Sequence, residues 1–84
     1  MKRVLVTGSA GRVGRAAVRG LAAAGHHVTG FDLRPTPGLP PAQSVVASLA
    51  DIAALRAAAA GVDCLIHLAA TPDDARYPRG SPPD

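Results

Sequence analysis

Short apolar runs alternate along the chain with longer segments in which apolar residues recur every three or four positions. The short runs are rich in β-branched and other apolar side chains and show little alternation, which is typical of strands covered on both faces. They predict four strands, at residues 4–6, 27–32, 44–47 and 64–70.

The first longer segment, residues 12–24, has the period of an amphipathic helix. Its predicted buried stripe consists of Val13, Ala17, Leu21 and Ala24. Gly25 predicts the end of the helix, and Gly20 inside it favours a close approach of the helix to the sheet.

The second longer segment, residues 51–60, repeats Ile52, Leu55 and Ala59 at helical spacing. Asp51 is a natural N-cap for this helix, and Gly61 predicts its end.

Strands that alternate with helices favour an α/β fold built on a parallel sheet of about four strands. If the third strand lies outside the second and the fourth returns beside the first, the strand order is 3-2-1-4. Right-handed crossovers then place one helix on each face of the sheet. We expect one domain over residues 1–72, with a surface loop at the proline-rich residues 33–43 and an irregular, proline-rich tail at residues 73–84.

Composition narrows the class of protein. A chain of 84 residues holds at most one small folding unit, and a single Cys cannot form an intramolecular disulfide. The apolar run at the N-terminus is interrupted at Thr7-Gly8, so it does not form a signal peptide, and no stretch is long and apolar enough to span a bilayer. We therefore expect a cytoplasmic protein without a membrane partner.

The segment between the first strand and the first helix reads Thr7-Gly8-Ser9-Ala10-Gly11-Arg12-Val13-Gly14. Gly8 permits a tight turn out of the strand, Gly11 leaves room for a phosphate beside the backbone, and Gly14 lets the helix pack on the sheet. The N-terminus of the helix presents unpaired N–H groups and a partial positive charge. A pyrophosphate group suits this position.

Asp32 stands at the end of the second predicted strand, 18 residues after Gly14. A carboxylate at this place binds the adenosine ribose hydroxyls of NAD, so dinucleotide binding is favoured over a glycine-rich turn beside a solvated Asp. The same charge repels the 2′-phosphate of NADP, and NAD is therefore the favoured cofactor. Arg34 and Arg12 are the residues that would weaken this preference.

Three motifs in this order, the glycine segment, Phe31-Asp32 and Leu65-Ile66-His67-Leu68-Ala69-Ala70, resemble the NAD-dependent epimerase/dehydratase family of extended short-chain dehydrogenases. The resemblance covers about the first 72 residues and implies a partial Rossmann fold. The cofactor-binding residues that it implies are Gly8, Ala10, Gly11, Arg12, Val13, Gly14, Asp32, Ser48, Leu49, Leu68, Ala69 and Ala70. Ser48 stands where the family usually has an Asp that bonds the adenine.

Members of this family use a catalytic Tyr and a Lys four residues later, and the Tyr acts as general acid or base. Here Tyr77 is the single Tyr, Ser81 follows it by four residues, and Lys2 is the single Lys. We therefore expect no catalytic residue in this chain and no turnover by the chain alone. A truncated gene product, a frameshifted reading and a fragment all fit this pattern equally.

Two further constellations are interpreted as structural. Cys64 and His67 are spaced like metal ligands, but side chains three apart on a strand point to opposite faces, so buried structural positions are favoured over a metal site. Arg12, Arg15 and Arg19 share one side of the first predicted helix. The low aromatic content favours a solvated face over a nucleic-acid surface.

The leading hypothesis is the NAD-binding N-terminal portion of an epimerase, dehydratase or dehydrogenase that acts on a sugar, a uronate or a sugar nucleotide. The alternative is a non-catalytic dinucleotide-binding module with a regulatory or assembly role, and a small nucleic-acid-binding protein is the least favoured reading. Two helices cover four strands thinly, so we expect a marginal fold that self-associates through the exposed sheet.

Overall fold

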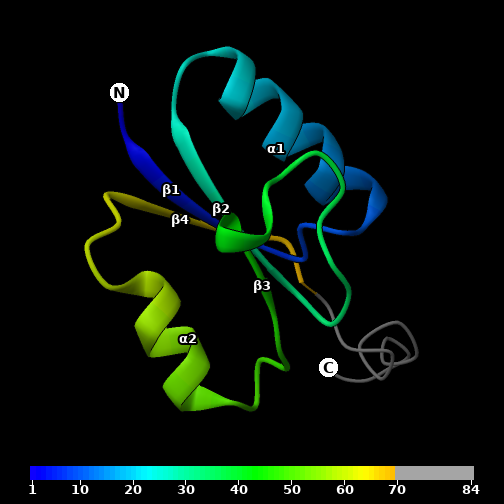
Figure 1. The fold of residues 1–84 in the computed structure, drawn as a ribbon, viewed down its shortest axis with the longest axis vertical. Helices are drawn as coiled ribbons and strands as arrows, with labels where there is room; N and C mark the ends of the chain where they lie inside the picture. The colour runs from blue at the N-terminus through cyan, green and yellow to red at the C-terminus, as the bar shows by residue number, and fades with distance from the viewer. Residues whose placement is uncertain (70–84) are drawn as a thin grey trace, which may run out of the picture.

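A computed structural model, which describes residues 1–69, shows that the chain folds as a parallel sheet with two helices (Figure 1). Its elements are β1 (Arg3–Thr7), α1 (Arg12–Ala23), β2 (His27–Asp32), a 3₁₀ turn (Pro41–Gln43), β3 (Ser44–Val46), α2 (Ile52–Ala59) and β4 (Cys64–His67). Every predicted strand and helix is present, although β4 ends at His67 rather than at residue 70. The predicted tail at residues 73–84 lies outside the described residues.

The four strands are parallel and follow the order β3-β2-β1-β4, which confirms the predicted topology. Leu5 in the middle of β1 lies opposite Thr29 of β2 on one side and Leu65 of β4 on the other. The central strands β1 and β2 therefore carry the core, and β3 and β4 form the two edges within residues 1–69.

The two helices cover opposite faces of the sheet, as predicted. Val4, Val6 and Val28 point to one face and form the buried core with Val18 of α1. α2 lies over the other face, on the side of Arg3, His27 and Thr29. Figure 1 shows the strands running diagonally between the two helices.

The buried side of α1 agrees with the predicted stripe only in part: Ala17 and Leu21 are half-buried, and Leu21 packs against the core. Val13 is 64% exposed and Ala24 is also exposed, whereas Gly14 and Val18 are buried. A Cβ atom on Gly14 would overlap the carbonyl oxygen of Gly8, so the backbone of the helix meets the end of β1 at this point. This close contact turns the Gly14 and Val18 side of α1 toward the sheet.

Gly20 does not mark a close approach, and that prediction is wrong. No atom lies within 4 Å of where its Cβ would stand, and the residue is exposed. The close approach occurs instead at Gly14, which confirms the prediction that this residue lets the helix pack on the sheet. Gly25, with a φ of 91°, ends the helix as predicted.

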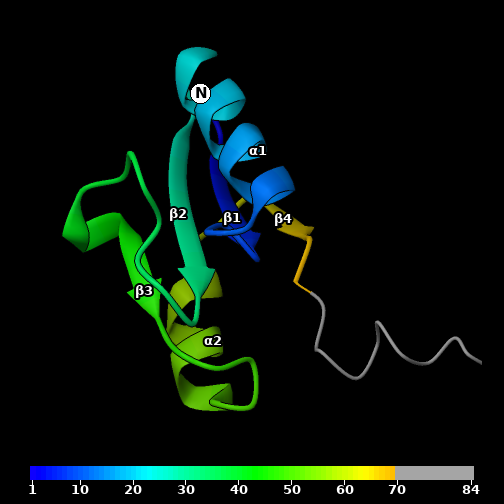
Figure 2. The ribbon, with the colours of Figure 1, turned by 90° about the vertical axis from the view of Figure 1, so that its right-hand side faces the viewer.

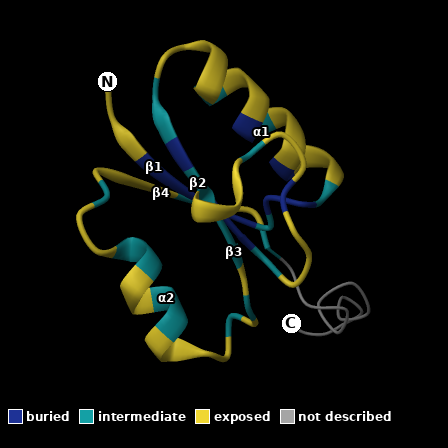
Figure 3. Ribbon diagram, viewed as in Figure 1, coloured by how far each residue is buried: buried dark blue, intermediate teal, exposed yellow. Residues whose placement is uncertain are grey.

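α2 is held less firmly than α1. The Asp51 Oδ1 atom accepts a hydrogen bond from the Ala54 N–H at 3.0 Å, which confirms the predicted N-cap. The helix nevertheless has no buried residue, and a hollow of about 390 Å³, lined on the helix side by Ala54, Ala57 and Ala58, lies between it and the sheet. Figure 3 shows buried residues on β1, β2 and α1 but none on α2.

β4 is an exposed strand in the described part of the chain. Cys64 and His67 are both exposed, so the prediction of buried positions is wrong. Within residues 1–69, β4 pairs with β1 alone and no helix covers Leu65, which is 53% exposed. The Nδ1 atom of His67 forms a hydrogen bond with the Thr7 hydroxyl at 2.6 Å.

The proline-rich segment 33–43 is more than a surface loop. Thr36 is 3% exposed, Leu39 packs against the core, and the Gln43 side chain donates a hydrogen bond to the Val28 carbonyl at 2.7 Å. A 3₁₀ turn forms at its end. This segment therefore packs back over the first part of the chain.

Residues 1–69 form neither a membrane-spanning helix nor a cluster of metal ligands. No helix there is long and apolar enough to cross a membrane. No three His, Cys or Asp side chains in this part of the chain gather closely enough to hold a metal ion.

Candidate functional site

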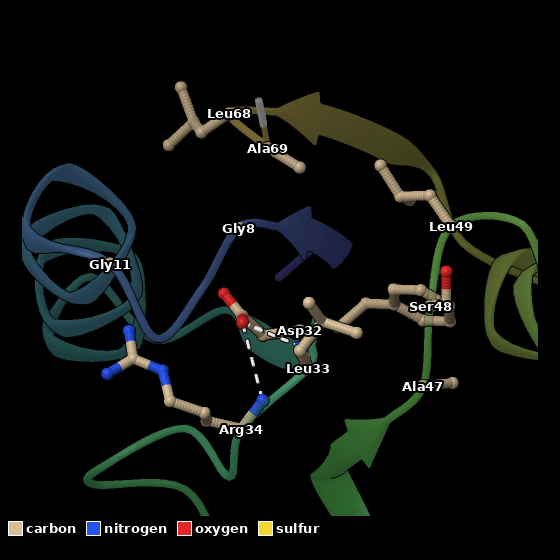
Figure 4. A pocket seen from close by; sticks show the side chains of 11 residues that line it. Gly8, Gly11, Asp32, Leu33, Arg34, Ala47, Ser48, Leu49, Leu68 and Ala69 are labelled. Carbon is tan, nitrogen blue, oxygen red and sulfur yellow. Dashed lines mark hydrogen bonds between the residues drawn. The ribbon is translucent and has the colours of Figure 1, made fainter. Parts of the chain in front are cut away.

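A cavity of about 460 Å³ opens at the carboxyl ends of the strands (Figure 4). In the order β3-β2-β1-β4, the connections after β1 and β3 run in opposite directions, and ligands of open α/β sheets bind in the crevice that this arrangement creates. The cavity is lined by Gly8, Gly11, Phe31, Asp32, Leu33, Arg34, Ala47, Ser48, Leu49, Leu68 and Ala69.

The glycine loop, residues 8–11, forms the inner wall of the cavity. Gly8 has a φ of 75°, and a Cβ atom there would stand 2.7 Å from the Ala69 nitrogen after β4. Only glycine combines this backbone conformation with that space. The Gly11 N–H donates a hydrogen bond to the Gly8 carbonyl at 3.2 Å, which closes the loop on itself.

The N-terminus of α1 follows the loop directly and is positive. Gly11 is the N-cap and has no side chain to accept the first N–H groups of the helix. The first turn holds no acidic residue, and Arg12 and Arg15 add positive charge to the helix dipole. This end of α1 suits an anionic group.

Asp32 faces the glycine loop from the end of β2. Its Oδ2 accepts a hydrogen bond from the Ala10 N–H at 3.0 Å, and its Oδ1 accepts from the N–H groups of Leu33 and Arg34 at 2.6 and 3.3 Å. An ionised carboxylate has about four acceptor positions, so free capacity remains, mainly on Oδ2. The half-buried side chain can therefore hold the loop and still accept a hydrogen bond from a hydroxyl group of a ligand in the cavity.

Arg34 and Thr36, which follow Asp32 in the chain, also bond the glycine loop. The Arg34 Nη2 atom donates a hydrogen bond to the Ala10 carbonyl at 3.2 Å, and the buried hydroxyls of Ser9 and Thr36 bond to each other. A Cβ atom on Gly30 would stand 2.5 Å from the Thr36 hydroxyl, so Gly30 leaves the space for this pair.

The outer wall is formed by the segment after β3. The Ser48 hydroxyl oxygen accepts a hydrogen bond from the Ala50 N–H at 3.1 Å, which shapes the turn. Leu49 from this turn and Leu33 from the turn after β2 give the cavity an apolar part. An uncharged flat group fits between such side chains.

The structure gathers seven of the predicted cofactor-binding residues around one cavity. These are Gly8, Gly11, Asp32, Ser48, Leu49, Leu68 and Ala69. Ala70 lies outside the described residues.

The other predicted residues do not line the cavity. Ala10 is buried with its N–H on Asp32, and Gly14 is buried against Gly8. Arg12 and Val13 are exposed on α1.

Sequence reasoning missed the cavity-lining residues Phe31, Leu33 and Ala47, and it considered Arg34 only as a partner for a 2′-phosphate. It also missed the Ser9 and Thr36 pair. A glycine inside a strand often marks a close approach of other atoms, so Gly30 was the signal that could have revealed this contact.

The sequence matches the NAD-dependent epimerase/dehydratase family over residues 4–80. An L-arabinose 1-dehydrogenase (NAD(P)(+)) from Haloferax volcanii is 44% identical over 73 residues, which make up 87% of this chain and 27% of that protein. A crystal structure of a short-chain dehydrogenase/reductase superfamily protein from Agrobacterium tumefaciens with bound NAD superposes with a TM-score of 0.74. It shares 49% identity and covers 86% of this chain and 23% of its own.

The chain thus spans 27% and 23% of the lengths of these two relatives. The family match, in contrast, covers most of the present sequence, from the first strand to residue 80. The chain belongs to the NAD-dependent epimerase/dehydratase family.

Proposed function

We propose that this chain is the NAD-binding N-terminal portion of a dehydrogenase, epimerase or dehydratase that acts on a sugar, a uronate or a sugar nucleotide. The observation that carries the proposal is that the glycine loop and Asp32 are bonded to each other and line one cavity. The name of the Haloferax relative supports a sugar as the substrate class. The proposal includes a cytoplasmic location, which the single Cys supports because cytoplasmic proteins seldom depend on disulfides.

The residues around the cavity fit the parts of a dinucleotide. The open N–H groups of α1 beside Gly11 would hold the pyrophosphate, and the free capacity of Asp32 would accept a ribose hydroxyl. Leu33 and Leu49 would cover the adenine. The cofactor, when bound, takes or gives a hydride at its nicotinamide ring.

NAD is the proposed cofactor in preference to NADP. The Asp32 carboxylate stands where a 2′-phosphate would lie and repels it. Arg34 is the cation next to this position, but its guanidinium is already bonded to the Ala10 carbonyl. Both features favour a ribose with a free 2′-hydroxyl.

The described residues place neither a Lys nor a Tyr beside the cavity. Lys2 stands at the amino end of β1, on the opposite edge of the parallel sheet, and Tyr77 lies outside the described residues. We therefore propose that this chain binds the cofactor and that a catalytic pair, where the reaction occurs, comes from elsewhere.

Calorimetric titration of the purified chain with NAD and NADP tests the binding function. The Gly11→Val variant should lose NAD binding because its branched side chain would enter the cavity beside the open end of α1. It should stay folded, since Gly11 has a φ of −78° and a Cβ there meets one atom, the Gly8 carbonyl oxygen at 3.5 Å. The matched control is Gly20→Ala on the exposed side of α1. Unchanged NAD binding by Gly11→Val, or no binding by the parent chain, would contradict the proposal.

A further inference from the structure

Side chains at the end of β2 and in the turn after it form hydrogen bonds with both polar backbone groups of Ala10 in the glycine loop. The Ala10 N–H donates to Asp32 Oδ2 at 3.0 Å, and the Ala10 carbonyl accepts from Arg34 Nη2 at 3.2 Å. The neighbouring Ser9 hydroxyl is bonded to Thr36. The side chains of Asp32 at the end of β2 and of Arg34 and Thr36 after it therefore bond two consecutive residues of the loop.

Asp32 also organises the turn that presents Arg34. Its Oδ1 accepts the N–H groups of Leu33 and Arg34, so one carboxylate bonds both the loop and the turn. Figure 4 shows the Arg34 side chain extended from this turn until its guanidinium lies below Gly11. The two side chains thus form a single unit, which we call the Ala10 clamp: Asp32 on the N–H and Arg34 on the carbonyl.

The clamp acts on a glycine-rich segment. Two of the four residues at positions 8–11 are glycines, which have the largest conformational entropy to lose when a loop becomes ordered. Ala10 is 6% exposed, and the guanidinium is a hydrogen-bond partner of its carbonyl. A loop that is already ordered binds a ligand at a smaller entropic cost.

We propose that Arg34 is a positioning residue for the pyrophosphate: it holds the glycine loop through the Ala10 carbonyl and does not itself contact the phosphates. This inference rests on the proposed binding of NAD. It also means that the guanidinium has two competing uses, because an Arg34 side chain that turned to a 2′-phosphate would release the loop.

The test compares a ligand that has a pyrophosphate with one that lacks it. NMR titrations give the Kd of NAD, of NADP and of adenosine for the parent chain and for Arg34→Ala. We expect Arg34→Ala to weaken NAD binding about tenfold, the scale of one hydrogen bond from a charged donor. Adenosine binding should change less than about twofold, since its contacts do not involve the loop. Arg34→Lys, which keeps a charged donor of similar reach, should recover most of the affinity for NAD.

A control variant removes the same charge elsewhere. Arg56→Ala on the exposed surface of α2 should bind NAD like the parent. Three results would overturn the proposal: an equal loss for NAD and adenosine, which would indicate direct contact with the nucleoside; a loss confined to NADP; or no loss at all.

A ligand-free measurement separates this inference from the function on which it rests. In Arg34→Ala without cofactor, the backbone amides of Ser9, Ala10 and Gly11 should exchange with solvent faster than in the parent, while those of β1 stay unchanged. If the parent chain binds no NAD, the proposed function fails, and the exchange rates still decide whether the clamp exists. Unchanged exchange at Ala10 would show that Arg34 does not hold the loop.

Discussion

Gly14 and Gly20 are two glycines of the same helix in opposite surroundings. A Cβ on Gly14 would overlap the carbonyl oxygen of Gly8, whereas a Cβ on Gly20 would meet nothing within 4 Å. Gly14→Ala should therefore lower the free energy of unfolding by about 1–3 kcal/mol, because backbone atoms must shift to admit the methyl group. Gly20→Ala should raise it by about 0.5–1 kcal/mol through helix propensity.

Urea denaturation of both variants, followed by circular dichroism, measures these changes, and each variant is the control for the other. Equal effects of the same sign would mean that α1 does not contact the end of β1 through Gly14.

Asp32 combines a role in the loop with a role in cofactor choice. In Asp32→Ala, NAD should lose a hydrogen bond and the Ala10 anchor, which we expect to weaken its binding about tenfold or more. NADP should lose less, since the same change removes the repulsion of its 2′-phosphate. The ratio of the two Kd values, measured by calorimetry, should therefore move toward one.

Asp32→Asn separates charge from hydrogen bonding, because it keeps one acceptor oxygen and removes the charge. It should admit NADP while holding NAD better than Asp32→Ala does. Tighter binding of NADP than of NAD by the parent chain would show that the arginines determine the choice.

For the helices and strands, the local pattern of apolar residues predicts which elements form but not which neighbours each element contacts. The four strands and two helices follow from runs of apolar residues and from terminating signals such as Asp51 and Gly25. The buried side of α1 follows only in part, because Gly14 lies against Gly8 as predicted, whereas Val13 and Ala24 were expected to be buried and are exposed.

The candidate site shows the same limit. Gly8, Gly11 and Asp32 were predictable because their spacing along the chain sets their place at the ends of β1 and β2. The hydrogen bonds from Arg34 and Thr36 were not predictable, since they span 24 and 27 positions and depend on how a proline-rich segment folds back. The exposure of Cys64 likewise depends on what lies beside β4, which the apolar sequence of that strand does not specify.

The hollow beneath α2 gives a prediction at this scale. Ala58 is half-buried and lines the hollow of about 390 Å³, whereas Ala53 is exposed and does not line it. Ala58→Leu should raise the free energy of unfolding by about 1 kcal/mol, because it buries further apolar area in existing space.

The control is Ala53→Leu, which should change the free energy of unfolding by less than about 0.5 kcal/mol. Urea denaturation measures both variants. A loss of stability in Ala58→Leu with no change in Ala53→Leu would mean that α2 already packs tightly on the sheet.

Over the whole of residues 1–69, the core is concentrated on β1, β2 and α1, and apolar side chains remain at its margins. Leu65 on β4, Val46 on β3 and Ile52 on α2 are each 53% exposed (Figure 2 shows β4 at one end of the sheet). An edge strand with an apolar side chain offers unpaired backbone groups to another chain. The net charge of +3 provides little repulsion between copies.

The isolated chain should therefore self-associate through β4 and should melt below about 65 °C, the upper end of the usual range for mesophile domains. Leu65→Lys should shift the chain toward monomer in sedimentation velocity, since a charge on an edge strand opposes pairing with a second copy. Ile52→Lys, at a side chain of equal exposure on α2, is the matched control and should leave association unchanged. Equal effects of both variants would indicate nonspecific apolar contact rather than pairing along β4. A cooperative melt of a monomeric parent above 65 °C would contradict the prediction of marginal stability, because a fold that stable does not need its edge covered.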